Sequence, residues 1–259
     1  MTLRGLTAVA CTLALVALPF ASRDAAAQII TTQKDVEAQL RVQWMMMKRN
    51  TPLHPSARVQ RLAQCVAFSI IEQIPEELQN LDWEILVFDD EMRNAMVTPE
   101  GKIAVFGGLL DVADTPDKLA AVLGHEVAHL TQDHVKERIG RARMTGAFGA
   151  LGGAVTGVDS SGMAAVLLQF PFQREQETEA DVVGMTYMAR AGYNPSVTIE
   201  LWRAMGGGDR FDRRNRPPEW LSTHPDPELR MTDIARNLAP ALVEYHNALD
   251  AGVRPRCAL

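Results

Sequence analysis

The sequence predicts an α+β fold that is mostly helical and contains one small antiparallel β-sheet. Apolar residues recur at helical spacing along most of the chain, and only the stretch between residues 83 and 106 is rich in strand-forming residues around a turn. The chain has 259 residues, of which 47% are hydrophobic and 22% are charged. This composition excludes disordered and collagen-like classes, and the length suffices for one sizeable core.

The first 27 residues differ from the rest of the chain. Arg4 gives a positive start, residues 6–21 are almost wholly apolar, and residues 25–27 are small residues of the kind that signal peptidase accepts. A transmembrane anchor is the alternative, but the apolar run is short for a span of about 20 residues and Pro19 interrupts it. We therefore expect a cleaved secretory signal peptide at 1–27, a single domain at 28–259, and a periplasmic or otherwise exported protein.

Charge and cysteine content limit the partners and the cross-links. With 26 Lys and Arg against 32 Asp and Glu, the formal net charge is −6, so no nucleic acid partner is expected. Cys65 and Cys257 remain after cleavage. They either pair in an oxidising compartment or stay free, because two cysteines do not make a disulfide framework. The sequence leaves the oligomeric state open.

Helical spacing and breaker residues predict the helices, and the long central one begins at Thr115-Pro116. The predicted helical segments are 33–48, 56–74, 109–113, 116–130, 172–191, 195–205 and a final pair from 225 to 251. A strand is expected at 83–88, and the segments 95–97 and 102–106 flank the turn 98–101 as a hairpin.

A segment rich in Ala and Gly spans residues 144–170. Each of its two apolar arms is too short for a membrane span of about 20 residues. We interpret the segment as a loosely helical lid or core element, and a flap that contacts a membrane surface is the alternative. The loop 206–218 contains several arginines, and we expect it to be solvated.

The motif that points most directly to chemistry is His125-Glu126-Val127-Ala128-His129, inside the long predicted helix. Histidines four residues apart lie roughly 40° apart around a helix, so both imidazoles can reach one metal ion. Glu126 between them can face a water molecule on that metal. The sequence therefore predicts a zinc site on a rigid helix.

A catalytic zinc needs a third protein ligand and an open fourth position. The next predicted helix carries several acids, of which Glu177 and Asp181 are four residues apart and share a face. Glu175 and Glu179 point to other sides of that helix. One ligand and one carboxylate that orients a ligand histidine would fit this face, whereas an ordinary exposed charged face is the alternative.

Four ordered blocks of residues resemble the gluzincin zinc metallopeptidases of the HtpX and CAAX prenyl protease type. The blocks are Asn94-Ala95 with Pro99, Gly101 and Gly108-Leu109-Leu110; His125–His129 with His134; Glu177–Asp181 with Gly184; and Ser222-Thr223-His224-Pro225 with Arg230. Among the branches of this family, the chain resembles the exported, signal-bearing members, such as the β-barrel assembly-enhancing protease. The resemblance implies a zincin-like fold, with the small sheet beside the helix that carries the HExxH motif.

By this resemblance His125, His129 and Glu177 are the ligands of one Zn²⁺ per chain, and Glu126 is the general base. Asp181 would then be the carboxylate that orients a ligand histidine. The loop with His224 would return toward the metal, where His224 either donates a hydrogen bond to the oxyanion or caps the zinc in a resting state. A loop histidine without a catalytic role is the alternative.

His134 lies nine positions after His125, about half a turn around a continuous helix. We therefore do not expect it to share the metal, and we expect it to pack or form a hydrogen bond on the far side of the helix.

These residues predict a zinc endopeptidase, and the resemblance implies misfolded or unassembled envelope proteins as substrates. An exposed strand edge, either 94–97 or 102–106, would hold an extended or unfolded polypeptide beside the metal; the resemblance favours the segment near Asn94. A latent, chaperone-like zinc protein is the alternative function. A purely structural zinc site is disfavoured, because such sites are usually closed by four ligands rich in Cys.

Overall fold

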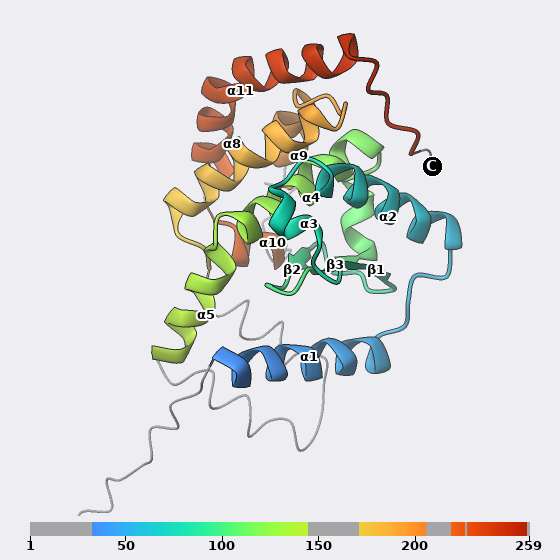
Figure 1. Ribbon diagram of the computed structural model, residues 1–259, viewed down its shortest axis with the longest axis vertical. Coiled ribbons are helices and arrows are strands. Elements are labelled where there is room, and N and C mark those ends of the chain that lie inside the picture. The colour runs from blue at the N-terminus through green and yellow to red at the C-terminus, as the bar shows by residue number, and fades with distance from the viewer. Residues whose placement is uncertain (1–32, 145–170, 206–218, 226, 258–259) are drawn as a thin grey trace, which may run out of the picture. The chain divides into compact units, whose positions relative to one another are not determined.

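The computed structural model describes residues 33–144, 171–205, 219–225 and 227–257, all within one compact unit, Thr31–Leu259. The predicted signal peptide, the loop 206–218 and all but the first residue of the segment 144–170 lie outside the described residues. The predicted α+β class is confirmed, because helices form most of the described chain and one small sheet accompanies them (Figure 1). No helix among the described residues combines the length and the apolar character needed to span a membrane.

The sheet has three strands, β1 (Glu84–Phe88), β2 (Ala95–Val97) and β3 (Lys102–Phe106), in the order β1-β3-β2. β2 and β3 form the predicted antiparallel hairpin, but β1 runs parallel to β3. The sheet is therefore mixed, and the prediction of an antiparallel sheet was wrong for β1. The middle strand β3 is buried on nearly its whole length, as expected for a strand with neighbours on both sides.

The edge of the sheet formed by β1 is covered, because other parts of the chain bond to its backbone. The backbone of Val87 in β1 accepts a hydrogen bond from the His54 N–H at 2.9 Å, and the Gln60 side chain bonds both its N–H (2.9 Å) and its carbonyl (2.6 Å). The Gln64 side chain covers the carbonyl of Ile85 in the same way. Of the two candidate edges, 102–106 is the middle strand, and β2 forms the outer edge of the hairpin.

The helices mostly follow the predicted segments. They are α1 (Gln33–Asn50), α2 (Ala57–Ile71), α3 (Glu76–Gln79), η1 (Gly107–Asp111), α4 (Pro116–Thr131), α5 (His134–Met144), α8 (Arg174–Arg190), α9 (Val197–Met205), α10 (Glu219–Thr223) and α11 (Pro227–Asp250). The expected final pair is one helix, α11, which continues through Pro240, and the short α10 precedes it.

Helix α4 is the centre of the core. Thr115 caps its first turn by accepting a hydrogen bond from the Lys118 N–H at 3.2 Å, and Pro116 occupies the first helical position. Every residue from Leu119 to Leu130 is buried, because α4 packs against α2, α8, α9 and β2. In turn, α11 packs against α8 and α9, as Figure 1 shows.

Two glycines set the distance between α4 and α8. A Cβ atom on Gly184 of α8 would lie 2.8 Å from the carbonyl carbon of Gly124 and 2.8 Å from the backbone nitrogen of His125, both in α4. Because this is far closer than non-bonded atoms approach, only glycine permits the observed packing. The contact brings the residues of α8 next to the histidines of α4.

A disulfide joins Cys65 of α2 to Cys257 near the C-terminus, with Cα atoms 5.7 Å apart and a sequence separation of 192. The sequence left this pairing open. The bond therefore attaches the segment after α11 to helix α2, which is early in the chain.

We expect Gly184→Ala to lower the free energy of unfolding by about 1–3 kcal/mol, because the added methyl group overpacks the contact between α4 and α8. Thermal denaturation followed by circular dichroism measures this. Gly140→Ala is the matched control, since a Cβ atom at Gly140 of α5 meets nothing within 4 Å and alanine favours helix. Equal stability of the two variants would contradict the expectation.

Removal of the disulfide by Cys65→Ser should destabilise the fold by about 2–5 kcal/mol, because the cross-link closes a long loop of the unfolded chain. Chemical denaturation of wild type with and without a reducing agent, beside the variant, measures the difference. The reducing agent should lower the stability of the wild type and leave that of the variant unchanged. If it leaves both unchanged, the two cysteines do not pair in solution.

Candidate metal centre

Helix α4 presents His125, Glu126 and His129 on its buried side. The Nε2 atoms of His125 and His129 lie 2.9 Å apart, because a separation of four residues places the two imidazoles on one face of the helix. All three side chains are almost fully buried. The predicted histidine pair therefore forms, with both ring nitrogens directed at the same point.

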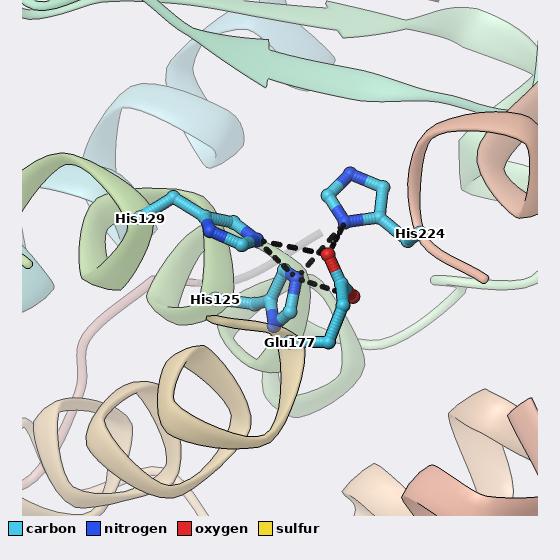
Figure 2. A group of neighbouring side chains, drawn as sticks. All are labelled: His125, His129, Glu177 and His224. Atoms are coloured by element: carbon cyan, nitrogen blue, oxygen red, sulfur yellow. Dashed lines mark hydrogen bonds and ion pairs between the residues drawn. The ribbon is translucent and has the colours of Figure 1, made fainter. Parts of the chain in front are cut away.

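Helix α8 brings Glu177 to the same point. One carboxylate oxygen of Glu177 lies 3.4 Å from His129 Nε2 and the other lies 3.6 Å from His125 Nε2. The residue after α10, His224, places its Nδ1 atom 2.9 Å from Glu177 Oε1 and 3.2 Å from His125 Nε2. Figure 2 shows the four side chains converging from three segments. One ligand atom from each lies within 4.8 Å of the others.

This donor set fits a metal ion. Imidazole nitrogens and a carboxylate oxygen are the ligands that zinc prefers, in a tetrahedral arrangement of four. Three imidazole nitrogens and one carboxylate face one another, with distances of 2.9–3.6 Å between their nitrogen and oxygen atoms. Their lone pairs can therefore point at a shared centre. The buried cluster can therefore hold one divalent cation.

Asp181 lies one turn after Glu177 and contacts the other side of His125, with its Oδ1 3.0 Å from His125 Nδ1. Arg230 of α11 donates two hydrogen bonds to Asp181, at 2.9 and 2.7 Å, and its Nη1 atom lies 2.6 Å from Glu177 Oε2. Its guanidinium lies 3.7 Å above the ring of Trp202. Sequence reasoning named Arg230 in a motif block but gave it no task, since nothing local links α11 to α8.

The prediction for His134 was half right. It is outside the group of metal-facing side chains, but it does not lie on the far side of the helix. The helix α4 ends at Thr131, Asp133 takes a positive φ of 59°, and α5 begins at His134. This break turns His134 back, so that its Nδ1 lies 3.0 Å from Nδ1 of His129 and its Nε2 lies 3.2 Å from Glu179.

Aromatic rings enclose the centre. Phe172 stacks on His129 with ring centroids 3.7 Å apart, and Trp220 stacks on His224 at 3.9 Å. The His224 backbone is held by a 2.8 Å hydrogen bond to the Trp220 carbonyl. Sequence analysis missed these rings; the contact of Phe172 with His129 joins segments that are distant in the chain.

Burial controls the protonation of the cluster. It lowers the pKa of His125 to about 4, that of His129 to about 3 and that of His224 to about 4, so all three are neutral at pH 7 and have lone pairs for a metal. Burial and the nearby Glu177 charge raise the pKa of Glu126 well above its usual value. Burial also opposes the ionisation of Glu177, but His224 and Arg230 outweigh it, and the pKa of Glu177 is lowered.

A pocket opens beside the cluster, between the outer strand of the sheet and the aromatic rings. The empty space between its walls, open mouth included, is about 390 Å³. Its lining residues are Met92, Asn94, Ala95, Met96, Val97, Phe106, Glu126, Arg138, Phe172, Thr223 and His224.

Comparison with known proteins gives a consistent result. The chain is 36% identical over 172 residues to "Mitochondrial metalloendopeptidase OMA1" of Schizosaccharomyces pombe, which covers 64% of this chain and 50% of that protein. It is 29% identical over 178 residues to the human OMA1 protein, covering 64% of this chain and 34% of that protein. It is 32% identical over 169 residues to "Beta-barrel assembly-enhancing protease" of Escherichia coli, covering 60% of this chain and 34% of that protein.

The matched part of the chain thus spans half or less of the length of these relatives. The model of "Peptidase family M48" matches residues 54–237, a range that contains the four converging side chains, the sheet and helices α2 to α10. The peptidase resemblance of the four sequence blocks is confirmed at the level of the family, and the chain belongs to peptidase family M48.

Proposed function

We propose that this protein is a zinc-dependent endopeptidase that hydrolyses peptide bonds of extended or unfolded polypeptides. The observation that carries the proposal is the buried group of His125, His129 and Glu177, with Glu126 beside it at the wall of a pocket. These three side chains would hold one Zn²⁺ per chain. The metalloendopeptidases among the relatives support the same activity.

A bound zinc ion polarises a scissile carbonyl and lowers the pKa of a bound water molecule to about 7. Glu126 is the general base in the proposal. Because its pKa is raised well above the usual carboxyl value, it can accept the proton of the attacking water and pass it to the leaving amine. Asp181 holds Nδ1 of His125 and thereby fixes the orientation of the ring.

His224 has two proposed tasks, and the geometry supports one more directly. Its Nδ1 atom faces the same centre as the three proposed ligands, while its Nε2 atom lies 3.5 Å from Glu126 Oε1. In this position His224 would be a fourth ligand of the zinc in a resting state. If it moved away from the metal, the same imidazole would be able to donate a hydrogen bond to the oxyanion of the reaction.

The edge of β2 is the proposed docking site for the substrate backbone. The Asn94 carbonyl and the Thr98 N–H bond to β3, so the backbone groups of Ala95 and Val97 both point away from β3. The Ala95 N–H donates to the Asn94 side chain at 2.9 Å, a hydrogen bond that a docked peptide would replace. An extended peptide can add to this edge by main-chain hydrogen bonds and pass the pocket that contains Glu126. Such binding tolerates many side chains, as a protease of unfolded chains requires.

We further propose that the substrates are misfolded or unassembled envelope proteins and that the protein is exported after cleavage of residues 1–27. The signal-like composition of 1–27 and the similarity to the Escherichia coli protease support this, and a disulfide fits an oxidising compartment. The segment 144–170 remains a proposed contact with a membrane surface.

A latent, chaperone-like protein is the second candidate function. The observation that favours it is the position of His224, which places a fourth side chain where a catalytic zinc would keep an open position. In that case the chain would bind zinc and unfolded polypeptides without turnover.

Glu126→Gln should reduce cleavage of an unfolded protein by about 10²–10⁴-fold, because glutamine keeps the size of the side chain but cannot accept the proton of water. The wild type and the variant are compared at matched zinc content by gel and mass spectrometry. Glu175→Gln, at an exposed position on α8, is the control and should cleave as the wild type does. If zinc-loaded wild type cleaves nothing, the latent function is supported instead.

His134→Gln should weaken zinc binding by about 10–100-fold, because it removes the partner that orients His129 from the side opposite the metal. Competition with a zinc chelator measures the affinity, and circular dichroism checks the fold. His246→Gln, which changes an exposed histidine of α11, is the control. Unchanged zinc affinity in His134→Gln would show that the contact with His129 does not support the metal site.

A further inference from the structure

Arg138 of α5 is a buried cation that forms no close ion pair among the described residues, although the charges of Glu126 and Glu177 act on it from a distance. Its exposed fraction is 5%, yet its Nε and Nη2 atoms have no hydrogen-bond partner, and no carboxylate forms an ion pair with it in the part of the chain that the structure describes. Its contact is the face of Phe172, 4.3 Å from the guanidinium carbon. A buried guanidinium without a partner is costly, since desolvation removes its water and nothing replaces it.

Burial lowers the pKa of Arg138 to about 9, so the side chain remains positively charged at neutral pH. By contrast, Arg230 is also buried but lies within ion-pair distance of Asp181 and Glu177. The two buried arginines of the centre thus differ in their ion pairs: Arg230 has two carboxylate partners, and Arg138 has none among the described residues.

Arg138 lies at the proposed substrate site. It lines the pocket that also contains Glu126, His224 and the β2 residues 95–97. Phe172, on which Arg138 lies, is itself stacked on His129. A peptide that follows the β2 edge past Glu126 therefore brings its side chains, or its end, into the same pocket as the guanidinium.

The pairing of the buried charges favours an anionic ligand. Arg230 has Glu177 and Asp181 within ion-pair distance, at 2.6 and 2.7 Å, whereas Arg138 stands at the wall of the pocket with unused donors. One carboxylate supplied by the substrate would give the Arg138 guanidinium a partner.

We propose that Arg138 binds a carboxylate of the polypeptide substrate and so selects for an acidic group next to the cleaved bond. This inference rests on the proposed peptidase function. The carboxylate can belong to an Asp or Glu side chain or to the C-terminus of a short peptide, and a guanidinium binds either in a bidentate manner. Arg138 then determines which peptide sequences are preferred. Its guanidinium forms an ion pair when a substrate with a carboxylate is bound.

The test measures binding of labelled ten-residue peptides to the full chain carrying Glu126→Gln, which should prevent cleavage. One peptide has a central Glu and an amidated C-terminus, the second a central Gln and an amidated C-terminus, and the third a central Gln and a free C-terminal carboxylate. Fluorescence anisotropy gives each dissociation constant, with zinc and after chelation. The same measurements are made after Arg138→Gln or Arg138→Lys is added to the Glu126→Gln chain. Lys136 is an exposed lysine of α5, and Lys136→Gln is the matched control for loss of a positive charge.

We expect the first or the third peptide to bind at least about tenfold more tightly than the neutral second one. The peptide that gains identifies the source of the carboxylate. The preference should disappear in Arg138→Gln, survive in part in Arg138→Lys, persist in Lys136→Gln, and weaken when zinc is removed. Retained helicity in circular dichroism shows that the variants are folded.

Equal affinities for all three peptides, including no binding of any, would overturn the inference, and so would a preference that persists in Arg138→Gln. A separate digestion of an unfolded protein by zinc-loaded wild type keeps the two proposals apart. Cleavage together with equal peptide affinities would retain the peptidase and remove the carboxylate site. Charge-dependent binding without cleavage would retain the site and remove the peptidase.

Discussion

The close contact between α4 and α8 is the constraint on which the rest of the centre depends. Gly124 and Gly184 let the two backbones meet at a distance that no side chain permits. This approach sets Glu177 opposite the two histidines of α4 and sets Asp181 against the outer nitrogen of His125. A separation larger by the width of a methyl group would move both carboxylates away from the imidazoles, because α8 carries them as one rigid element.

The second organising feature is a dense group of buried charges. Burial keeps the histidines neutral and raises the pKa of Glu126, while Arg230 compensates Asp181 and Glu177. Such a group is expensive in a low-dielectric interior unless every charge has a partner. The balance is completed by molecules from outside the chain, a divalent metal in the proposed function and a substrate carboxylate in the further inference. Binding and electrostatic stabilisation are thus linked in the same few residues.

Much of the fold followed from local patterns, and the failures share one cause. The helix that carries the HExxH residues, the hairpin and the helix that carries Glu177 were predicted from spacing and turn residues alone. Three features were not predicted. They are the parallel pairing of β1, the turn that brings His134 back to His129, and the ion pairs of Arg230. Each of these depends on a contact between segments that are far apart in sequence or, for His134, on the break after Thr131 at which a second helix begins.

The sequence by itself determined the types of ligand and their spacing, because a helix fixes which side chains share a face within one or two turns. His125 with His129 and Glu177 with Asp181 are such pairs. Only the tertiary structure decided that the pairs face each other, that His224 joins them, that β2 is the outer strand of the hairpin, and that Arg138 is buried without an ion pair to any described carboxylate. The physical reason is that convergence of side chains from different elements depends on close packing of backbones and on burial, which are properties of the assembled core and not of any single segment.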